Sequence, residues 1–294
     1  MWKKIDLSKI PTEVKKRDKE DKVKKTEKIL EKLYKLQRVL YAQKKYAILV
    51  VFQWLDASWK DGVSRSIFGK LDPNGIDIFS FKEPSEEEMG HDYLWRLHKK
   101  TPSKGMITIF NRSYYEDILV PTVTKTYDKD EIDKRYHQIN NFESYLDENN
   151  IKVIKFYFNV SKKVQKERLI ERLENPEKFW KHGDWDRKTI KLRDKYEKVY
   201  EEIFEKCNNP ERFFVPADHN RVKNYFVADV ILNEIEKLDL ERPDIKTDRS
   251  VDEYLDNVEW VDNIEDLKEM EEDIEKDAKE EAKKELKKKR GKKK

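Results

Sequence analysis

"FQWLDASWKDG", residues 52–62, raises the central question about this chain. It follows an apolar run, residues 46–52, of the kind that forms a buried strand. A strand that leads into Gly-x-x-x-x-Gly-Lys and then into a helix is a pattern that holds phosphate groups. Lys60 stands at the lysine position, but Trp54 and Trp59 stand where the two glycines belong. Taken alone, the segment is either a phosphate loop without its glycines or an exposed turn after a strand.

The residues that remain in this loop still suit phosphate chemistry. Glycines in such a loop permit positive φ and let backbone N–H groups approach the phosphate closely. A tryptophan at such a φ costs ~1–2 kcal/mol, which a folded domain can tolerate. Lys60 is a candidate phosphate clamp, and Asp56 and Asp61 are candidate metal-binding or base carboxylates. The N-terminus of the following helix adds a site that favours anions.

Strand and helix patterns alternate along the chain up to about residue 240. Short apolar runs predict strands at 46–52, 76–81, 106–110, 152–158 and 212–216. Helical patterns lie at 20–44, 62–70, 85–99, 128–149, 161–173, 185–207 and 219–238. This alternation predicts an α/β fold with a parallel sheet covered on both faces. Because such sheets bind ligands at the carboxyl ends of their strands, we expect the loop after the first strand to lie beside Asn111 and Arg112.

Charge is distributed unevenly. Charged residues make up 43% of the chain, far above the usual ~25%, although the formal net charge is only +3. Residues 252–281 are strongly acidic, and residues 282–294 are strongly basic. Two interpretations of this extension stay open: a solvated helix followed by a disordered tail, or a basic tail that holds a polyanion.

Composition also bears on location. Cys207 is the single cysteine, so no internal disulfide framework exists, which suits a reducing compartment. The first residues, MWKKIDLSKIPTEVKK, lack the apolar segment of a secretory signal. The longest apolar run, at 46–52, is far shorter than the ~20 residues that span a membrane. We therefore expect a soluble, cytoplasmic protein without a membrane segment.

Several further blocks, in order, carry a family resemblance. The third strand runs into Asn111-Arg-Ser-Tyr-Tyr-Glu-Asp117, within the longer similar stretch 80–120. Residues 135–181 continue the similarity and contain Arg168, Arg172 and the block PEKFWK, and FFVPADHNRVKNYFVADVI at 213–231 completes it. Together these blocks resemble the family-2 polyphosphate kinases over about residues 5–240.

The resemblance implies a fold and a division of the chain. The fold is a P-loop kinase-like three-layer α/β sandwich with a central five-stranded parallel sheet and a helical lid. An N-terminal segment and amphipathic helix would occupy residues 1–45, and the kinase domain would occupy 46–240, with the lid at about 161–195. Residues 241–294 would form the charged extension. We further expect a homo-oligomer, either a dimer or a tetramer.

The resemblance also implies Mg²⁺-dependent phosphoryl transfer between inorganic polyphosphate and a nucleotide. The acceptor would be ADP or AMP, with GDP or GMP as further possibilities. Within the family's loop pattern, this chain matches at Asp56, Ala57, Lys60, Asp61 and Gly62, differs mildly at Ser58, and differs strongly at Trp54 and Trp59. After Val120 the family usually continues Val-Arg-Val-His, whereas this chain has Pro121-Thr-Val-Thr.

Site roles follow from these matches. The catalytic set would be Asp56, Lys60, Asp61 and Arg112, with Asp56 and Asp61 as metal ligands. Ala57, Ser58, Gly62 and Asp117 would bind phosphate or nucleotide, and the lid cations Arg168, Arg172, Lys178 and Lys181 would bind polyphosphate. Positioned cations are what a highly negative phosphoryl-transfer transition state requires. Glu116 has two possible roles, contact with a metal or orientation of arginines, and we favour the second.

Alternatives remain at this stage. The four lid cations are either a polyphosphate channel or a solvated helix face, although Arg168 and Arg172 share one face because they are four residues apart. Tryptophans near the site either stack on a nucleobase or pack in the core. The chain is either an active phosphotransferase, a catalytically impaired relative that binds polyphosphate or partners, or a P-loop kinase with another donor. Intact Asp56, Lys60, Asp61 and Arg112 favour the first.

Overall fold

The structure is a computed structural model that describes residues 4–54, 60–181, 184–210, 212–243 and 276. Met1–Pro243 form one compact unit. The predicted charged extension, 241–294, therefore lies almost entirely outside the described residues, and its boundary near 240 stays a prediction.

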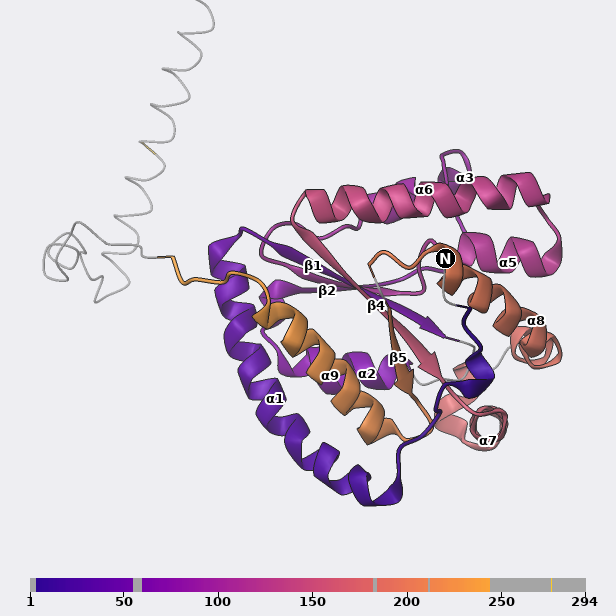
Figure 1. The fold of residues 1–294 in the computed structure, drawn as a ribbon, viewed down its shortest axis with the longest axis horizontal. Coiled ribbons are helices and arrows are strands. Elements are labelled where there is room, and N and C mark those ends of the chain that lie inside the picture. Colours follow the sequence, from indigo (N-terminus) through magenta and orange to yellow (C-terminus); the bar gives the residue numbers. More distant parts are fainter. Residues whose placement is uncertain (1–3, 55–59, 182–183, 211, 244–275, 277–294) are drawn as a thin grey trace, which may run out of the picture. The chain divides into compact units, whose positions relative to one another are not determined.

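Five parallel strands form the central sheet of the described chain, in the order β2-β3-β1-β4-β5 (Figure 1). The strands are β1 (Ala47–Trp54), β2 (Ile76–Ser80), β3 (Ile107–Asn111), β4 (Ile151–Asn159) and β5 (Arg212–Pro216). All eight residues of β1 are buried, as expected of a central parallel strand covered on both faces. Phe52 pairs with Asn111 and Trp54 pairs with Phe158, so the carboxyl ends of β1, β3 and β4 meet at one edge.

Helices cover both faces of the sheet, which confirms the predicted three-layer α/β sandwich (Figure 1). One layer contains α1 (Lys16–Gln43), α2 (Lys60–Ile67) and α9 (Asn220–Glu236). The other contains α4 (Trp95–His98), α5 (Glu116–Thr124), α6 (Lys129–Glu148) and α8 (Asp184–Lys206). The two cores follow the alternation of β1, because Val50 and Phe52 face the first layer and Leu49 and Val51 face the second.

The remaining helices are short or lie near the carboxyl edge. They are α3 (Glu86–Met89), α7 (Lys162–Glu174) and the 3-10 helices η1 (Leu7–Lys9), η2 (Phe68–Lys70), η3 (Pro73–Gly75) and η4 (Pro176–Lys181). The N-terminal segment crosses the carboxyl edge before α1 begins. Its Leu7 N–H donates to Glu201 of α8 at 2.8 Å, and Asn159 donates to the Ile10 carbonyl at 2.7 Å. This segment is therefore an integral part of the compact unit.

Two sequence expectations about helices were wrong. The single helix expected at 85–99 is two short helices, α3 and α4, separated by residues 90–94. Helix α3 is short because its two ends lie close together in the sequence. It begins after Ser85, which forms a capping box, and it ends at Gly90. The apolar residues of this stretch that reach the core belong to α4 and the residues just before it, such as Leu94 and Leu97, whereas α3 buries none of its residues.

Helix α5 was not among the helices expected from the sequence, and it contains Pro121. A proline inside a helix has no N–H for the carbonyl four residues before it, here that of Asp117. Arg135 from α6 replaces the missing donor, since its Nη1 donates to the Asp117 carbonyl at 2.7 Å. A tertiary contact therefore stabilises a helix that local propensity disfavours.

Candidate active site

The candidate active site lies at the carboxyl edge of the sheet, where β1 ends at Trp54 and α2 begins at Lys60. The predicted phosphate loop connects these two elements. Three predicted site residues of the loop, Asp56, Ala57 and Ser58, lie outside the described residues, as does Trp59. The backbone of Lys60 and Asp61 opens α2, while their side chains are not described. Gly62 lies in the first turn of α2 and is half-buried.

Trp54, one of the two residues at glycine positions, has a structural explanation. It is the last residue of β1, it is only 6% exposed, and it packs in the core with α1, α2 and α9. Its backbone is paired in the sheet with Phe158 and has no positive φ. The indole therefore fills space in the core, and this position does not require a glycine.

Arg112 has an unusual backbone at the same edge. It follows β3 directly and has a φ of 63°, a left-handed conformation that costs an L-residue ~1–2 kcal/mol. Its N–H donates to the Phe52 carbonyl at 3.2 Å, which links the end of β3 to the end of β1. Strained non-glycine residues cluster at functional sites, because the surrounding structure holds them there for a purpose. The conformation is consistent with the predicted catalytic role of Arg112.

Asp117 lies one turn of helix further along, between two arginines. Its Oδ2 is 3.8 Å from Arg96 Nη2 and has no hydrogen-bond partner among the described residues. Burial raises the pKa of the Asp117 carboxyl to about 6, against the opposing effects of Arg96 and Arg135. Arg96 in turn donates to the Lys82 carbonyl at 2.8 Å. Asp117 therefore helps to fix the segment after β2 against α5, and its predicted phosphate-binding role stays a prediction.

We expect a specific pH dependence from Asp117. Its pKa in the folded protein lies above the ordinary value of 3.8, so its stabilising contribution is complete below pH ~4 and is lost as pH rises through about 6. The free energy of unfolding of Asp117→Asn, relative to wild type, should thus rise between pH 4 and pH 7 by up to ~3 kcal/mol. Urea unfolding at several pH values measures this difference, with the exposed Asp77→Asn as control. Parallel pH profiles for wild type and Asp117→Asn would contradict the assignment.

The predicted lid consists of α7, η4 and the first part of α8. Arg168 does not behave as a free lid cation: it is 8% exposed, and its Nη2 donates to the Ala217 carbonyl at 2.8 Å. Arg168 therefore anchors α7 on the segment after β5, and its predicted polyphosphate-binding role stays a prediction. Arg172 is half-buried, and Lys178 forms an ion pair with Glu171. The side chain of Lys181 lies outside the described residues.

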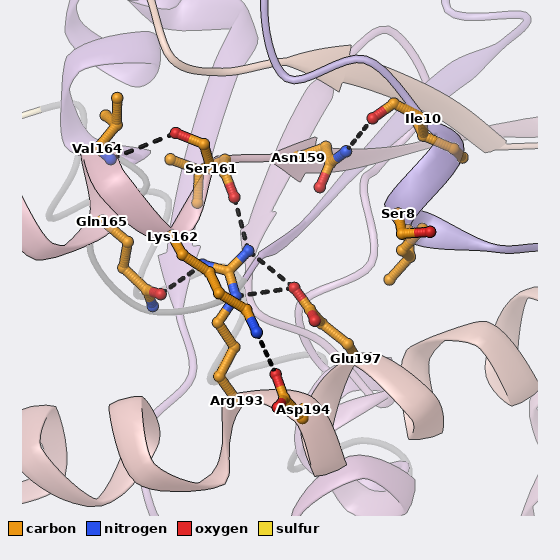
Figure 2. Close-up of polar contacts among 12 residues, drawn as sticks. Ser8, Ile10, Asn159, Ser161, Lys162, Val164, Gln165, Arg193, Asp194 and Glu197 are labelled. Atoms are coloured by element: carbon orange, nitrogen blue, oxygen red, sulfur yellow. Dashed lines mark hydrogen bonds and ion pairs between the residues drawn. The ribbon is translucent and has the colours of Figure 1, made fainter.

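A buried arginine of α8 secures the base of this lid. Arg193 is 7% exposed, and its Nη2 donates to the Val160 carbonyl just beyond β4 at 2.7 Å. Figure 2 shows the same guanidinium pointing at Gln165 of α7 and at Glu197 of its own helix. An exposed pair, Lys162 and Asp194, joins the same two helices at 2.7 Å. Sequence reasoning missed Arg193, because nothing in a lysine-rich amphipathic helix distinguishes a buried arginine from a solvated one.

A cavity of about 460 Å³ opens between α2 and β2 beside the site. Its lining combines apolar groups, such as Phe68 and Ile78, with Arg65 and Asn111. The oxygens Asn111 Oδ1 and Ser64 Oγ are buried without a hydrogen-bond partner among the described residues. The volume of this cavity lies within the range of small-molecule pockets, which are mostly apolar with a few polar groups.

The described residues lack two features. No group of three or more His, Cys, Asp or Glu side chains in them could hold a metal ion. Within the same residues, no helix is both long and apolar enough to cross a membrane.

The fold defines a class: an α/β kinase-like protein with a five-stranded parallel sheet between two layers of helices. Residues 16–243 match the family described as Polyphosphate kinase 2. The chain belongs to this family, and the sequence-based resemblance is confirmed.

Relatives and solved structures agree with this membership. The chain is 38% identical to an AMP/ADP-polyphosphate phosphotransferase of Meiothermus ruber, over 74% of this chain and 82% of the relative. It is 34% identical to an ADP-polyphosphate phosphotransferase of Rhodopseudomonas palustris, over 82% and 89%. The crystal structure of polyphosphate kinase 2 from Arthrobacter aurescens superposes with a TM-score of 0.78 at 32% identity, covering 84% of this chain and 90% of that one.

Proposed function

We propose that this protein transfers a phosphoryl group between inorganic polyphosphate and a nucleoside mono- or diphosphate. The family match over residues 16–243 is the observation that carries the proposal. The relatives from Meiothermus ruber and Rhodopseudomonas palustris bear names for this activity with AMP/ADP and with ADP. In the forward direction, the terminal P–O–P bond of polyphosphate breaks and a new P–O bond forms to an oxygen of the nucleotide phosphate.

Positioned cations would supply most of the catalysis. Phosphoryl transfer spreads negative charge over the transferred group, and enzymes stabilise it by placement and electrostatics. We assign Lys60 and Arg112 to the donor and acceptor phosphates, with Asp56 aligning the attacking oxygen. Arg172, Lys178 and Lys181 of the lid would bind the polyphosphate chain.

Mg²⁺ fits the residues available at the loop. It prefers oxygen ligands and usually binds through one or two carboxylates plus substrate phosphates, so it does not need a cluster of protein ligands. Asp56 and Asp61, which flank Lys60 in the sequence, form such a pair, and we propose them as its ligands. When bound, the ion neutralises charge on the phosphate oxygens.

The nucleoside would occupy the cavity between α2 and β2. The cavity lies next to Asn111 and hence next to Arg112, and its apolar walls suit a nucleobase. The acceptors we propose are ADP and AMP, followed by GDP and GMP.

The alternative is an impaired relative that binds polyphosphate or a partner without turnover. The buried position of Trp54 weakens this alternative, because one of the two glycine replacements is explained by core packing. Retention of Asp56, Lys60, Asp61 and Arg112 also favours an active enzyme.

A direct assay tests the proposed function. Purified protein is incubated with long-chain polyphosphate, Mg²⁺ and either ADP or AMP, and the ATP or ADP formed is measured. We expect product with at least one acceptor and its loss when EDTA removes the metal. Binding of polyphosphate without any product, with ADP, with AMP and in repeats with GDP and GMP, would favour the impaired relative instead.

Trp59 offers a separate prediction. If the loop is a strained phosphate cradle, Trp59→Gly should raise activity or phosphate affinity, because a backbone N–H can then approach more closely. If the indole instead stacks on the base, the same change should weaken ADP binding by ~1–3 kcal/mol. Titration calorimetry with ADP, together with steady-state kinetics, separates the two. No change in either quantity would place residue 59 outside the site.

We also propose a cytoplasmic location and a homo-oligomeric state, either dimer or tetramer. Cys207 is buried, and burial raises its thiol pKa to about 12, so it is an unreactive thiol that suits a reducing compartment. Light scattering on the purified protein measures the oligomeric state.

A further inference from the structure

Helix α8 contacts the ends of two neighbouring strands through one of its faces. Arg193 and Tyr200 are seven residues apart, which places them two turns apart on the same face. Arg193 donates to the Val160 carbonyl just beyond β4. Tyr200, which is fully buried, donates its hydroxyl to the Trp54 carbonyl at the end of β1 at 3.1 Å. Helix α8 therefore meets the sheet at Trp54, the residue that directly precedes the predicted phosphate loop.

A buried amide connects this hydroxyl to the strand end that carries Arg112. The Gln53 amide fits its surroundings fully in one orientation, in which its oxygen accepts from the N–H and the hydroxyl of Ser113 at 3.2 and 2.7 Å. Its nitrogen then donates to Glu116 Oε1 at 3.0 Å and to the Tyr200 hydroxyl at 3.1 Å. A tyrosine hydroxyl has one hydrogen, so accepting from Gln53 leaves that hydrogen for the Trp54 carbonyl.

These contacts form a single buried network. Gln53 is 4% exposed, Ser113 is 1% exposed and Tyr200 is 0% exposed, so water does not compete with the hydrogen bonds. In such surroundings a satisfied network defines the positions of its members closely, and a lost member leaves an unpaired polar group. The network joins three elements: the end of β1, the turn after Arg112, and α8.

We propose that Tyr200 is a positioning residue for the phosphate loop. It fixes the Trp54 carbonyl, and through Gln53 it fixes the distance between the end of β1, from which the loop starts, and the turn that carries Arg112. The proposal rests on the proposed function, because Lys60 and Arg112 must contact the same transferred phosphoryl group. Displacement of reacting groups by about 1 Å can cost as much as 10²-fold in rate, so a modest shift of the loop is measurable.

Tyr200→Phe is the test, and Tyr136→Phe is its matched control. Tyr136 is also buried, but its hydroxyl has no hydrogen-bond partner among the described residues, so its removal deletes an oxygen without breaking the network. We expect Tyr200→Phe to lower kcat about tenfold, the factor of one well-placed hydrogen bond, with the KM for nucleotide changed less than about twofold. Gln53→Met should have a similar effect. The double variant should lose little more than either single variant, because both act on one network.

A second readout does not depend on activity. Hydrogen exchange of the peptide covering residues 52–62 should rise about fivefold in Tyr200→Phe and stay unchanged in Tyr136→Phe. An inactive wild type with this exchange pattern would refute the proposed function and leave the structural link standing. Equal kcat and equal exchange in Tyr200→Phe and Tyr136→Phe would overturn the proposal, as would multiplicative losses in the double variant.

Discussion

Arg112→Gly is expected to lower turnover by ~10³-fold or more while the folded protein becomes no less stable. The kinetic loss follows from removing a guanidinium that stabilises the transferred group, an effect that reaches 10³–10⁵-fold for arginines in phosphoryl transfer. The stability result follows from the φ of 63°, which glycine adopts without the strain of a side chain. We expect the free energy of unfolding to stay level or to rise by up to ~1 kcal/mol.

Two further variants isolate the causes. Arg112→Ala loses the same guanidinium but keeps a side chain at positive φ, so its turnover should fall equally without a gain in stability. Arg221→Ala removes an exposed charge from α9 and should leave both quantities unchanged. Steady-state kinetics and urea unfolding give the two measurements. Turnover within threefold of wild type in Arg112→Gly would exclude Arg112 from catalysis.

Lys155→Met is expected to cause the largest loss of stability. Lys155 is 2% exposed, and its Nζ lies 2.7 Å from Oε2 of Glu143, which is 0% exposed. Tyr114 and Tyr115 both donate to the other carboxylate oxygen at 2.7 Å. Removing the lysine leaves a buried carboxylate without its countercharge, which costs ~3–5 kcal/mol. Thermal unfolding should show a decrease in Tm of ~10 °C for a domain of this size.

A partner variant and a control make this prediction specific. Lys155→Met combined with Glu143→Gln removes the uncompensated charge but keeps an acceptor for the tyrosines, so part of the lost stability should return. Lys152→Met, on the same strand, breaks a pair whose lysine is about one-third exposed, and should cost ~1 kcal/mol or less. Similar decreases in Tm for Lys152→Met and Lys155→Met would show that burial of the pair is unimportant.

The regular parts of the fold were predictable because they depend on local patterns. The apolar run that became β1 is buried on both faces, and its alternation between two cores follows from strand geometry alone. The parallel sheet brought the end of β1 next to Arg112, as the order of strands and helices indicated. The family was identified from several sequence blocks that match in the same order, because these blocks contain the expected site residues as well as the core of the fold.

Other features arise from contacts between residues distant in the sequence, so no local pattern reveals them. The sequence presents Trp54 as a lost glycine, whereas the fold buries it in the core. It presents Pro121 as a helix breaker, but Arg135 supplies the missing hydrogen bond and α5 forms. The charge of Arg168 suggested a lid residue in contact with substrate, but its side chain is buried and donates to the Ala217 carbonyl. In the sequence, nothing distinguishes Tyr200 from the other aromatic residues of its amphipathic helix. Its partner, the Trp54 carbonyl, lies 146 residues away, and only the packing of α8 on the sheet brings the two together.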